Sequence, residues 1–309
     1  MSPWQRVAVT ALVAACATNS AGTPPPVPAP TPASASAPTV SQAAPPPPPV
    51  APAPPAAHHK PPDVVRYGPS ATRYIITRRF RVQQSFGGPP EVQDLGARLF
   101  VTVAISGPAD AGRYPTTFTV DSIVPDSNTP EPLGSMIGKV RSVVFAGRLA
   151  PVGEFDGVAA SDTTAIVSVT QFVPNFRDFL PRIPAAGVKL GSTWTDTLVL
   201  GQRAGGGSAM SRRAIVRSTA IAWEDRGGAQ VLHIETTASY DVKGSGQNSG
   251  QSLQFAGSGA GSARVFLGED GRFVGGESRD SLNLTVTIPA QGATIPTIQV
   301  VNSTVATRP

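Results

Sequence analysis

The chain has 309 residues, of which 25 are lysine or arginine and 20 are aspartate or glutamate, so its formal net charge is +5. Its basic residues occur singly or in pairs. They lack the interleaved basic and aromatic residues typical of nucleic-acid-binding proteins, so we expect no nucleic acid partner. The single cysteine, Cys16, excludes a disulfide framework within the chain.

The first segment is a short apolar run that ends at this cysteine. Arg6 gives a positive start, residues 7–15 are largely apolar, and Val13-Ala14-Ala15-Cys16 closes the run. It is too short to span a bilayer, which takes about 20 apolar residues, but it fits a secretory signal. The order resembles the lipobox of a bacterial lipoprotein signal peptide. That resemblance implies that residues 1–15 are removed and that Cys16 is lipidated.

A lipidated Cys16 implies a membrane anchor. A lone cysteine in an exported protein has no disulfide partner, which favours lipidation over a plain signal peptide cut after Ala21. Stable anchoring needs more than one acyl chain, and lipoproteins of this type carry two or three. Ala17 follows the cysteine, where an aspartate would imply retention at the inner membrane. The resemblance therefore implies the outer membrane of the cell envelope, with the body facing the periplasm or the surface.

Residues 16–62 are predicted to be a disordered linker rich in proline and alanine. Residues 21–62 hold 17 of the 33 prolines, no acidic residue and only Lys60 as a formal charge. Such a segment buries too little apolar surface to offset its chain entropy. In the extended polyproline conformation it would reach roughly 100 Å, so we interpret it as a spacer. A ligand for proline-reading modules is the alternative.

Residues 63–309 form the body, which contains all 20 acidic and 23 of the 25 basic residues. Alternating or β-branched runs between turns rich in glycine and proline predict an all-β, mainly antiparallel fold. Asp270-Gly271 is a hairpin signal. We expect one large curved sheet or half-barrel, because a sheet of this size must curl or close to protect its edges, with two small domains as the alternative. The predicted strands are residues 73–82, 98–105, 116–123, 139–145, 195–200, 213–223, 231–242, 262–267, 281–288 and 295–300, the last followed by a fraying tail.

One short helix is predicted in the middle of the body. Phe172, Phe176, Phe179 and Leu180 follow a spacing that places them on one helical face. One interpretation is a helix that caps the open end of a sheet. The other is one wall of an apolar pocket, with Phe172, Phe176, Phe179 and Trp194 as candidate ligand-binding residues.

A proline-rich crossover follows the predicted helix. Its pattern combines Pro181, Pro184, Val188, Gly191 and Trp194 as Pro-x-x-Pro-x-x-x-Val-x-x-Gly-x-x-Trp. This pattern resembles a signature of uncharacterised, β-rich bacterial envelope lipoproteins with domains of unknown function. The resemblance covers fourteen residues and implies no known activity.

Two similar offsets suggest an internal duplication. Tyr74 and Trp194 open comparable strands 120 residues apart, and two Gly-x-Phe-x-Gly motifs centred on Phe155 and Phe273 lie 118 residues apart. The repeats would be residues 63–160 and 188–309, joined by residues 161–187. The alternative is that hairpins in β proteins resemble one another.

The body is poor in catalytic groups. Its one histidine, His233, alternates with Leu232 and Ile234, so we expect it to face solvent and to build neither a transition-metal site nor a catalytic triad. No Gly-x-Ser-x-Gly elbow is present. The glycine-rich residues 257–261 do not lie between a strand and a helix, which argues against phosphate binding. They are interpreted as a loop, or as strand where something packs closely.

Three hypotheses for function follow. The first is a non-catalytic module that binds a hydrophobic or glycan ligand. The second is a structural or assembly protein that docks on another envelope protein through a sheet edge. The third is a hydrolase that uses acidic residues such as Glu224 and Asp225, with calcium or without. We expect the first, with no enzymatic activity, no cofactor and no metal.

Overall fold

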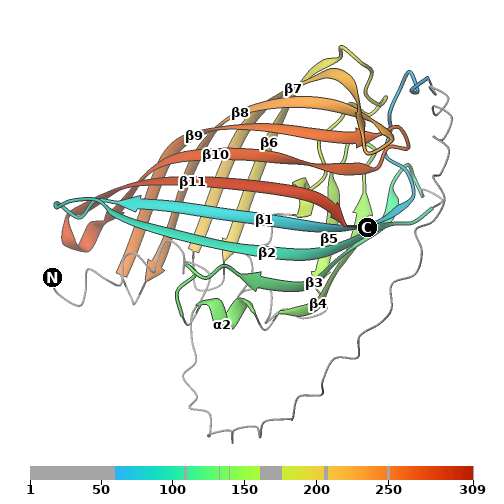
Figure 1. Cartoon of the computed structure of the whole chain (residues 1–309). Coiled ribbons are helices and arrows are strands. Elements are labelled where there is room, and N and C mark those ends of the chain that lie inside the picture. The colour runs from blue at the N-terminus through green and yellow to red at the C-terminus, as the bar shows by residue number, and fades with distance from the viewer. Residues whose placement is uncertain are drawn as a thin grey trace, which may run out of the picture. The chain divides into compact units, whose positions relative to one another are not determined.

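A computed structural model describes residues 60–107, 110–131, 133–138, 140–160, 176–204, 208–248 and 251–308. The leader, Cys16 and nearly all of the linker lie outside these residues, as does Phe172. The body forms one antiparallel sheet of eleven strands that is not closed into a barrel (Figure 1). The prediction of a large, mainly antiparallel sheet is confirmed.

The strands are long, and most extend beyond the alternating runs that predicted them. Their bounds are β1 Ser70–Gln84, β2 Glu91–Ile105, β3 Tyr114–Pro125, β4 Arg141–Leu149, β5 Phe155–Ala160, β6 Thr193–Ala204, β7 Ser208–Arg226, β8 Ala229–Asn248, β9 Gln251–Gly268, β10 Phe273–Ile288 and β11 Ala293–Arg308.

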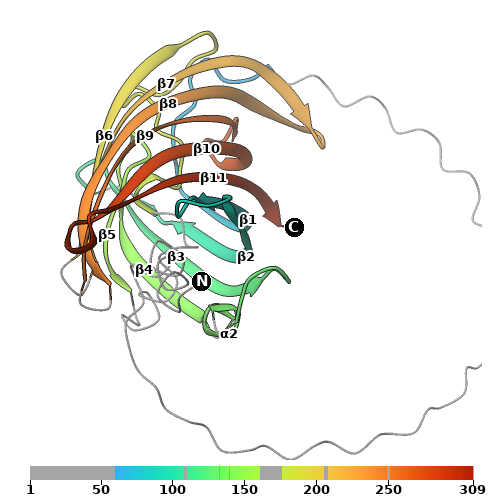
Figure 2. The same ribbon diagram turned by 90° about the vertical axis from the view of Figure 1, so that its left-hand side faces the viewer.

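The first and last strands lie in the centre of the sheet. The order is β5-β4-β3-β2-β1-β11-β10-β9-β8-β7-β6, so the two edges, β5 and β6, are consecutive in sequence. Figure 2 shows the sheet curling around its inner face as a half-barrel. The fraying tail predicted after residue 300 is wrong, because Arg308 still pairs with Arg73 of β1. A central strand has partners on both sides, and this holds the last residues of β11 in the sheet.

The period-two alternation of the strands separates an inward, concave face from an outward, convex face. On β1, Tyr74 and Ile76 are buried whereas Arg73 is exposed. Inward residues from β1, β3, β5, β8 and β9 meet in one core cluster, which identifies the inner face as the concave one. The outward residues of β8 to β11 are mostly polar and exposed, the pattern of a sheet with one face in water.

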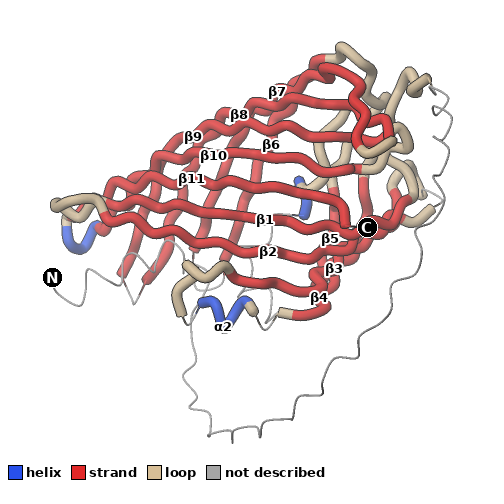
Figure 3. The backbone as a smooth tube through the Cα atoms, in the orientation of Figure 1, coloured by secondary structure: helices blue, strands red, loops and turns tan. Residues whose placement is uncertain are grey.

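The helices are minor (Figure 3). A short α-helix, α2 Leu133–Ile137, follows the β3 strand, in part where a loop was predicted. The 3-10 helix η1, Phe176–Asp178, lies in the segment predicted as helical. A second 3-10 turn, η2 Pro289–Gln291, links β10 to β11.

The markers of the suggested duplication occupy matching strands. Tyr74 lies on β1 and Trp194 on β6, the first strands of the two runs. Phe155 begins β5 and Phe273 begins β10, the fifth strand of each run, and both rings are buried. The duplication stays a prediction. The matching positions of these markers in the two runs of strands are consistent with it.

Candidate functional site

The concave face of the half-barrel is the candidate site. It carries two apolar clusters, one at each end of the long strands, and a band of charged residues between them. The two clusters differ in how they are built, and that difference decides where a ligand fits.

The first cluster is a packed aromatic core. Phe118 of β3 stacks on Phe176 with ring centroids 4.7 Å apart and meets Phe155 edge-on at the same distance. Phe179 completes the group at 5.4 Å from Tyr74 and 5.7 Å from Phe273. Each such pair contributes about 0.5–1.5 kcal/mol beyond the burial of its area. The cluster is therefore an anchoring point for strands of both halves.

Phe176 and Phe179, two of the predicted ligand-binding residues, belong to this core. Their side chains are 5% and 9% exposed. Their rings contact other rings of the protein, as expected of a segment that caps one end of a sheet. A ligand at these two rings would have to displace that packing. Their predicted role in ligand binding stays a prediction, and the geometry gives it no support.

The crossover is fastened to the same end of the sheet. The indole Nε1 of Trp194, half-buried against the first cluster, donates to the Arg182 carbonyl at 3.0 Å. Val188 forms a bridge with Val65, and the Tyr67 hydroxyl donates to the Pro181 carbonyl at 2.5 Å. Burial raises the pKa of Tyr67 well above its ordinary value, with a smaller contribution from Tyr74. The Pro-x-x-Pro-x-x-x-Val-x-x-Gly-x-x-Trp residues thus fix the path of the chain.

A charge network holds the crossover to the β4–β5 hairpin and to β6. Arg182, 15% exposed, contacts Asp178 at 2.7 Å, Glu154 at 3.2 Å and Asp196 at 3.6 Å. Arg177 Nε donates to Glu154 Oε1 at 2.8 Å. Burial alone would raise the pKa of Glu154, but the hydrogen bonds and charges of both arginines lower it below its ordinary value. The network is structural, because its members are paired with one another.

The described members of the second cluster lie in one layer, the sheet itself. They all belong to β6 to β11, except Phe86, which belongs to the β1–β2 loop. An apolar sheet face needs a second layer to cover it. In the first cluster, η1 packs on the sheet as a second layer. In the second cluster, no described helix contributes a side chain. The members are Ala214, Tyr240, Val242, Leu253, Leu284, Val286, Ile288 and Ile295, with Phe86, Leu198, Val216, Phe255, Leu282 and Ala293 partly buried against them.

A charged belt separates the two clusters; we define it as Arg78, Arg212 and Asp280, with Tyr240. Arg212 of β7 reaches Asp280 of β10 at 3.6 Å, and its guanidinium lies 3.7 Å from the centroid of the Tyr240 ring. Burial lowers the pKa of Arg78 to about 10 and raises that of Asp280. The charges of this belt are thus partly withdrawn from water on the inner face.

Two glycines of β9 make room for the belt. A Cβ at Gly259 would overlap the Tyr240 ring and the Ser281 carbonyl, and one at Gly261 would overlap the Asp280 carboxylate. Residues 257–261 are part of β9 and pair with β8 and β10. Of the two interpretations given above, loop or closely packed strand, the second is confirmed. Small residues here let the side chains of neighbouring strands lie across β9.

Sequence reasoning missed the belt, although the pattern contains a signal for it. Arg78 stands in phase with the inward residues Ile76 and Phe80, and Asp280 in phase with Leu282. A charged residue in the apolar phase of an alternating strand points inward. The signal is the position of these charged residues in the alternating pattern, where apolar residues are expected.

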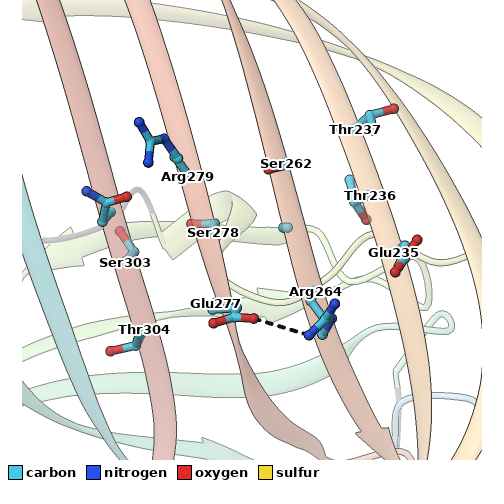
Figure 4. Close-up of a pocket in the computed structure, with 12 residues that line it drawn as sticks. Glu235, Thr236, Thr237, Ser262, Arg264, Glu277, Ser278, Arg279, Ser303 and Thr304 are labelled. Carbon is cyan, nitrogen blue, oxygen red and sulfur yellow. Dashed lines mark ion pairs between the residues drawn. The ribbon is translucent and has the colours of Figure 1, made fainter.

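The convex face carries a shallow groove of about 430 Å³ across β8, β9, β10 and β11 (Figure 4). Arg264 and Glu277 form an ion pair of 3.5 Å in it, and both side chains are at least half exposed. The lining is polar and includes no aromatic ring on which a sugar could stack. The groove is lined by Glu235, Thr236, Thr237, Ser262, Ala263, Arg264, Glu277, Ser278, Arg279, Asn302, Ser303 and Thr304.

His233 does not face solvent as predicted. It lies on the outward side of β8, as the alternation indicates, but it is only 7% exposed. The Phe266 ring lies 5.2 Å away, and Arg226 lies over that ring. Glu224, offered above as a hydrolase residue, is paired through Oε1 with His233 Nδ1 at 2.7 Å. Cross-strand neighbours bury the imidazole, and alternation alone does not reveal them.

The described residues contain no group of three or more histidine, cysteine, aspartate or glutamate side chains that could hold a metal ion. Within the same residues, no helix has the length and apolar character needed to cross a membrane.

Comparisons with known proteins add little. No known family matches the chain, and no curated protein matches it. Among solved structures, the chain is similar to a loop L8 deletion mutant of OmpT, an outer membrane protein of Vibrio cholerae. The two are 9% identical, with 76% of this chain and 99% of that chain covered and a TM-score of 0.17. A score this low carries no argument about fold or function.

Proposed function

We propose that the chain is a lipoprotein of the bacterial cell envelope, anchored in the outer membrane through Cys16, whose half-barrel binds a hydrophobic ligand on its concave face. The second apolar cluster carries the proposal. Its described members lie on one layer of a curved sheet, and Leu198, Phe255 and Leu282 among them are only partly buried, so an apolar ligand on this layer would bury them further. Sites for small ligands are concave and largely apolar, with a few placed polar groups.

The anchor is proposed on the residues around Cys16. The apolar run, the small residues before the cysteine and the proline-rich linker support lipidation. Mass spectrometry of the mature amino terminus tests it directly. An acylated Cys16 is the expected result, and an unmodified start at Gly22 would contradict it. Cys16→Ser should move the protein from the membrane fraction to the supernatant.

The ligand is tested on the chain from residue 16 onward carrying Cys16→Ser, so that no acyl anchor of its own can occupy the face. We expect extraction with organic solvent to release a lipid, and the stripped protein to bind a fluorescent fatty acid. Leu284→Lys places a charge in the second cluster and should abolish binding, whereas Thr285→Lys on the exposed face of the same strand should not. Leu282→Ala, at a half-buried position, keeps the test valid should the lysine variant not fold. If the stripped Cys16→Ser chain with no further substitution bound no fatty acid, the proposal would be overturned.

Docking on another envelope protein is the second candidate. Within the part of the chain that the structure describes, β5 and β6 each pair with a strand on one side only, and exposed edge strands are sites of β-strand addition. Crosslinking from Thr193 of β6 in intact cells should recover a partner. A protein recovered only as itself would count against this candidate.

A further inference from the structure

A cavity of about 460 Å³ lies at the end of the sheet where β11 stops (Figure 1). The first residues of β1, the last residues of β11 and one residue of the β9–β10 turn line it. None of these residues belongs to either apolar cluster or to the groove on the convex face. We call it the arginine cavity, and its lining residues are Ala71, Thr72, Arg73, Arg272, Thr307 and Arg308.

Three arginines line the arginine cavity, and no acidic residue does. They come from three elements, since Arg73 lies on β1, Arg308 on β11 and Arg272 in the β9–β10 turn. Arg73 and Arg308 stand directly opposite each other in the register of the two central strands. Like charges at such positions destabilise a sheet, so an anion bound between them would offset their repulsion.

The protein compensates only part of this positive charge. Arg272 Nε lies 3.6 Å from Asp270 Oδ2, and the two side chains are 43% and 58% exposed, so the pair contributes little. The Arg308 guanidinium lies 5.7 Å from the centre of the Phe100 ring, which positions the charge without neutralising it. Arg73 forms no ion pair with any residue in the described part of the chain. Three guanidinium groups against one carboxylate leave two positive charges.

Thr72 adds a buried hydroxyl that needs a partner. The residue is 6% exposed, and its Oγ1 makes no hydrogen bond of regular geometry within the described residues. Burial raises the pKa of the neighbouring Tyr74, and the nearby Thr72 hydroxyl lowers it, but the Tyr74 proton is donated to the Phe273 carbonyl. A buried hydroxyl without a hydrogen bond carries a desolvation penalty, so an acceptor inside the cavity would be stabilising.

We propose that the arginine cavity binds a phosphate monoester. Such a group carries about −1.5 to −2 charges near neutral pH and has three acceptor oxygens. It therefore matches two uncompensated positive charges and donors on three elements, whereas a carboxylate offers one charge and two oxygens. Arginine is suited to this role because its planar guanidinium donates two parallel hydrogen bonds to phosphate. The cavity is separate from the proposed hydrophobic site, so either site can fail without the other.

The first test compares methyl phosphate, a monoester, with dimethyl phosphate, a diester that carries one charge. Calorimetric titration uses the chain from residue 16 with Cys16→Ser. We expect the monoester to bind at least about 10-fold more tightly, and Arg73→Gln or Arg308→Gln to weaken it about 10-fold each, because each removes a charged hydrogen-bond donor. Arg213→Gln, on the exposed face of β7, is the matched control. If it weakened binding as much as Arg73→Gln, the effect would be one of net charge and the proposal would be overturned.

Two further substitutions examine the parts of the cavity separately. Asp270→Asn keeps the oxygen that accepts from the Arg272 backbone N–H but releases the guanidinium, so it should tighten methyl phosphate binding several-fold. Thr72→Val should weaken binding without lowering the urea midpoint, because no internal hydrogen bond is lost. Asp270→Asn and Arg272→Gln shifting the affinity in the same direction would contradict the proposal. So would a lack of methyl phosphate binding by the Cys16→Ser chain, which leaves the hydrophobic site intact.

Vesicles distinguish a lipid head group from a soluble ester. Phosphatidylcholine vesicles are prepared with phosphatidic acid, whose head is a phosphate monoester, or with phosphatidylglycerol, whose head is a diester. Recruitment by phosphatidic acid alone would extend the site to lipid head groups. Methyl phosphate binding without recruitment would assign the cavity to soluble phosphate esters. Equal recruitment by the two anionic lipids, lost equally in Arg213→Gln and Arg73→Gln, would be attraction by net charge and would overturn the proposal.

A last variant examines the end of the expressed chain. Arg308 is followed by Pro309, which lies outside the described residues. Adding Gly-Ser-Gly after Pro309 moves the terminal carboxylate of the expressed chain away from that position. We expect the affinity for methyl phosphate to stay the same. If only the extended chain bound methyl phosphate, the cavity would belong to the chain's own carboxylate, and the proposal would be overturned.

Discussion

The hydroxyl of Tyr74 donates a hydrogen bond of 2.7 Å to the carbonyl of Phe273, 199 residues further along the chain, and their rings lie 5.8 Å apart. This contact lies where the two runs of strands join at the centre of the sheet. Burial raises the pKa of Tyr74, so the hydroxyl stays protonated and keeps its donor throughout the physiological range.

Tyr74→Phe should destabilise the body by about 1–3 kcal/mol, because it leaves the buried carbonyl of Phe273 without this donor. The ring contacts are preserved, so the packing of the first cluster should not change. The midpoint of urea unfolding measures the effect. Tyr114→Phe, at a tyrosine that is only half-buried, is the control and should cost less than half as much. Equal losses in the two variants would contradict the role of the Tyr74 hydroxyl.

The strands could be predicted from sequence because their signal is local. Leu282, Leu284, Val286 and Ile288 alternate within seven residues, and this pattern needs no knowledge of the partner strand. The pairing of β1 with β11 could not be predicted in this way. Residues such as Arg73 and Arg308 meet across almost the whole body, and no short-range pattern specifies such a pair. For this reason a central strand was predicted to end in a fraying tail.

The candidate site was predicted only in part. Phe176 and Phe179 were identified by their spacing, but spacing does not show whether aromatic rings enclose a ligand or one another. The belt depends on Arg212 reaching Asp280 across two intervening strands, which is possible because Gly259 and Gly261 have no side chain. That relationship requires the sheet order and the register, and neither was available from the sequence.

Gly259→Ala should destabilise the protein even though alanine is otherwise the better strand residue. Replacing a strand glycine normally gains about 0.5–1 kcal/mol, but overpacking a filled position costs about 1–3 kcal/mol. Here the new Cβ would overlap the Tyr240 ring and the Ser281 carbonyl, and the carbonyl is backbone that cannot turn away. We therefore expect a net loss in thermal or urea unfolding. Ser258→Ala, on the exposed face of β9, is the control and should stay within about 0.5 kcal/mol.

Glu154 should make part of the stability depend on acid pH. Its pKa in the folded state is below the ordinary value of 4.5, so its contribution is complete above that pH and is lost as the pH falls through the lower folded value. We expect the free energy of unfolding to fall less between about pH 6 and about pH 3 in Glu154→Gln than in the unsubstituted protein. Glu277→Gln is the control variant, because its parent side chain is 63% exposed in a surface ion pair with Arg264. A slope that Glu154→Gln does not alter would contradict the network.

Glu224→Ala should lower stability, because the carboxylate holds a buried imidazole rather than standing free in a turn. His233 is 9% exposed at its side chain, and its Nδ1 lies 2.7 Å from Glu224 Oε1. Removing the acceptor leaves a buried N–H without a partner, which costs about 1–3 kcal/mol. Glu224 itself is 35% exposed, so water can replace part of the bond and we expect the lower half of that range. Glu224→Gln retains an acceptor oxygen and should recover most of the loss. Glu269→Ala, at an exposed acid in the β9–β10 turn, should be neutral within about 0.5 kcal/mol. If Glu224→Ala left the unfolding midpoint unchanged, the pairing with His233 would not explain this acid, and the hydrolase hypothesis would regain its first candidate residue.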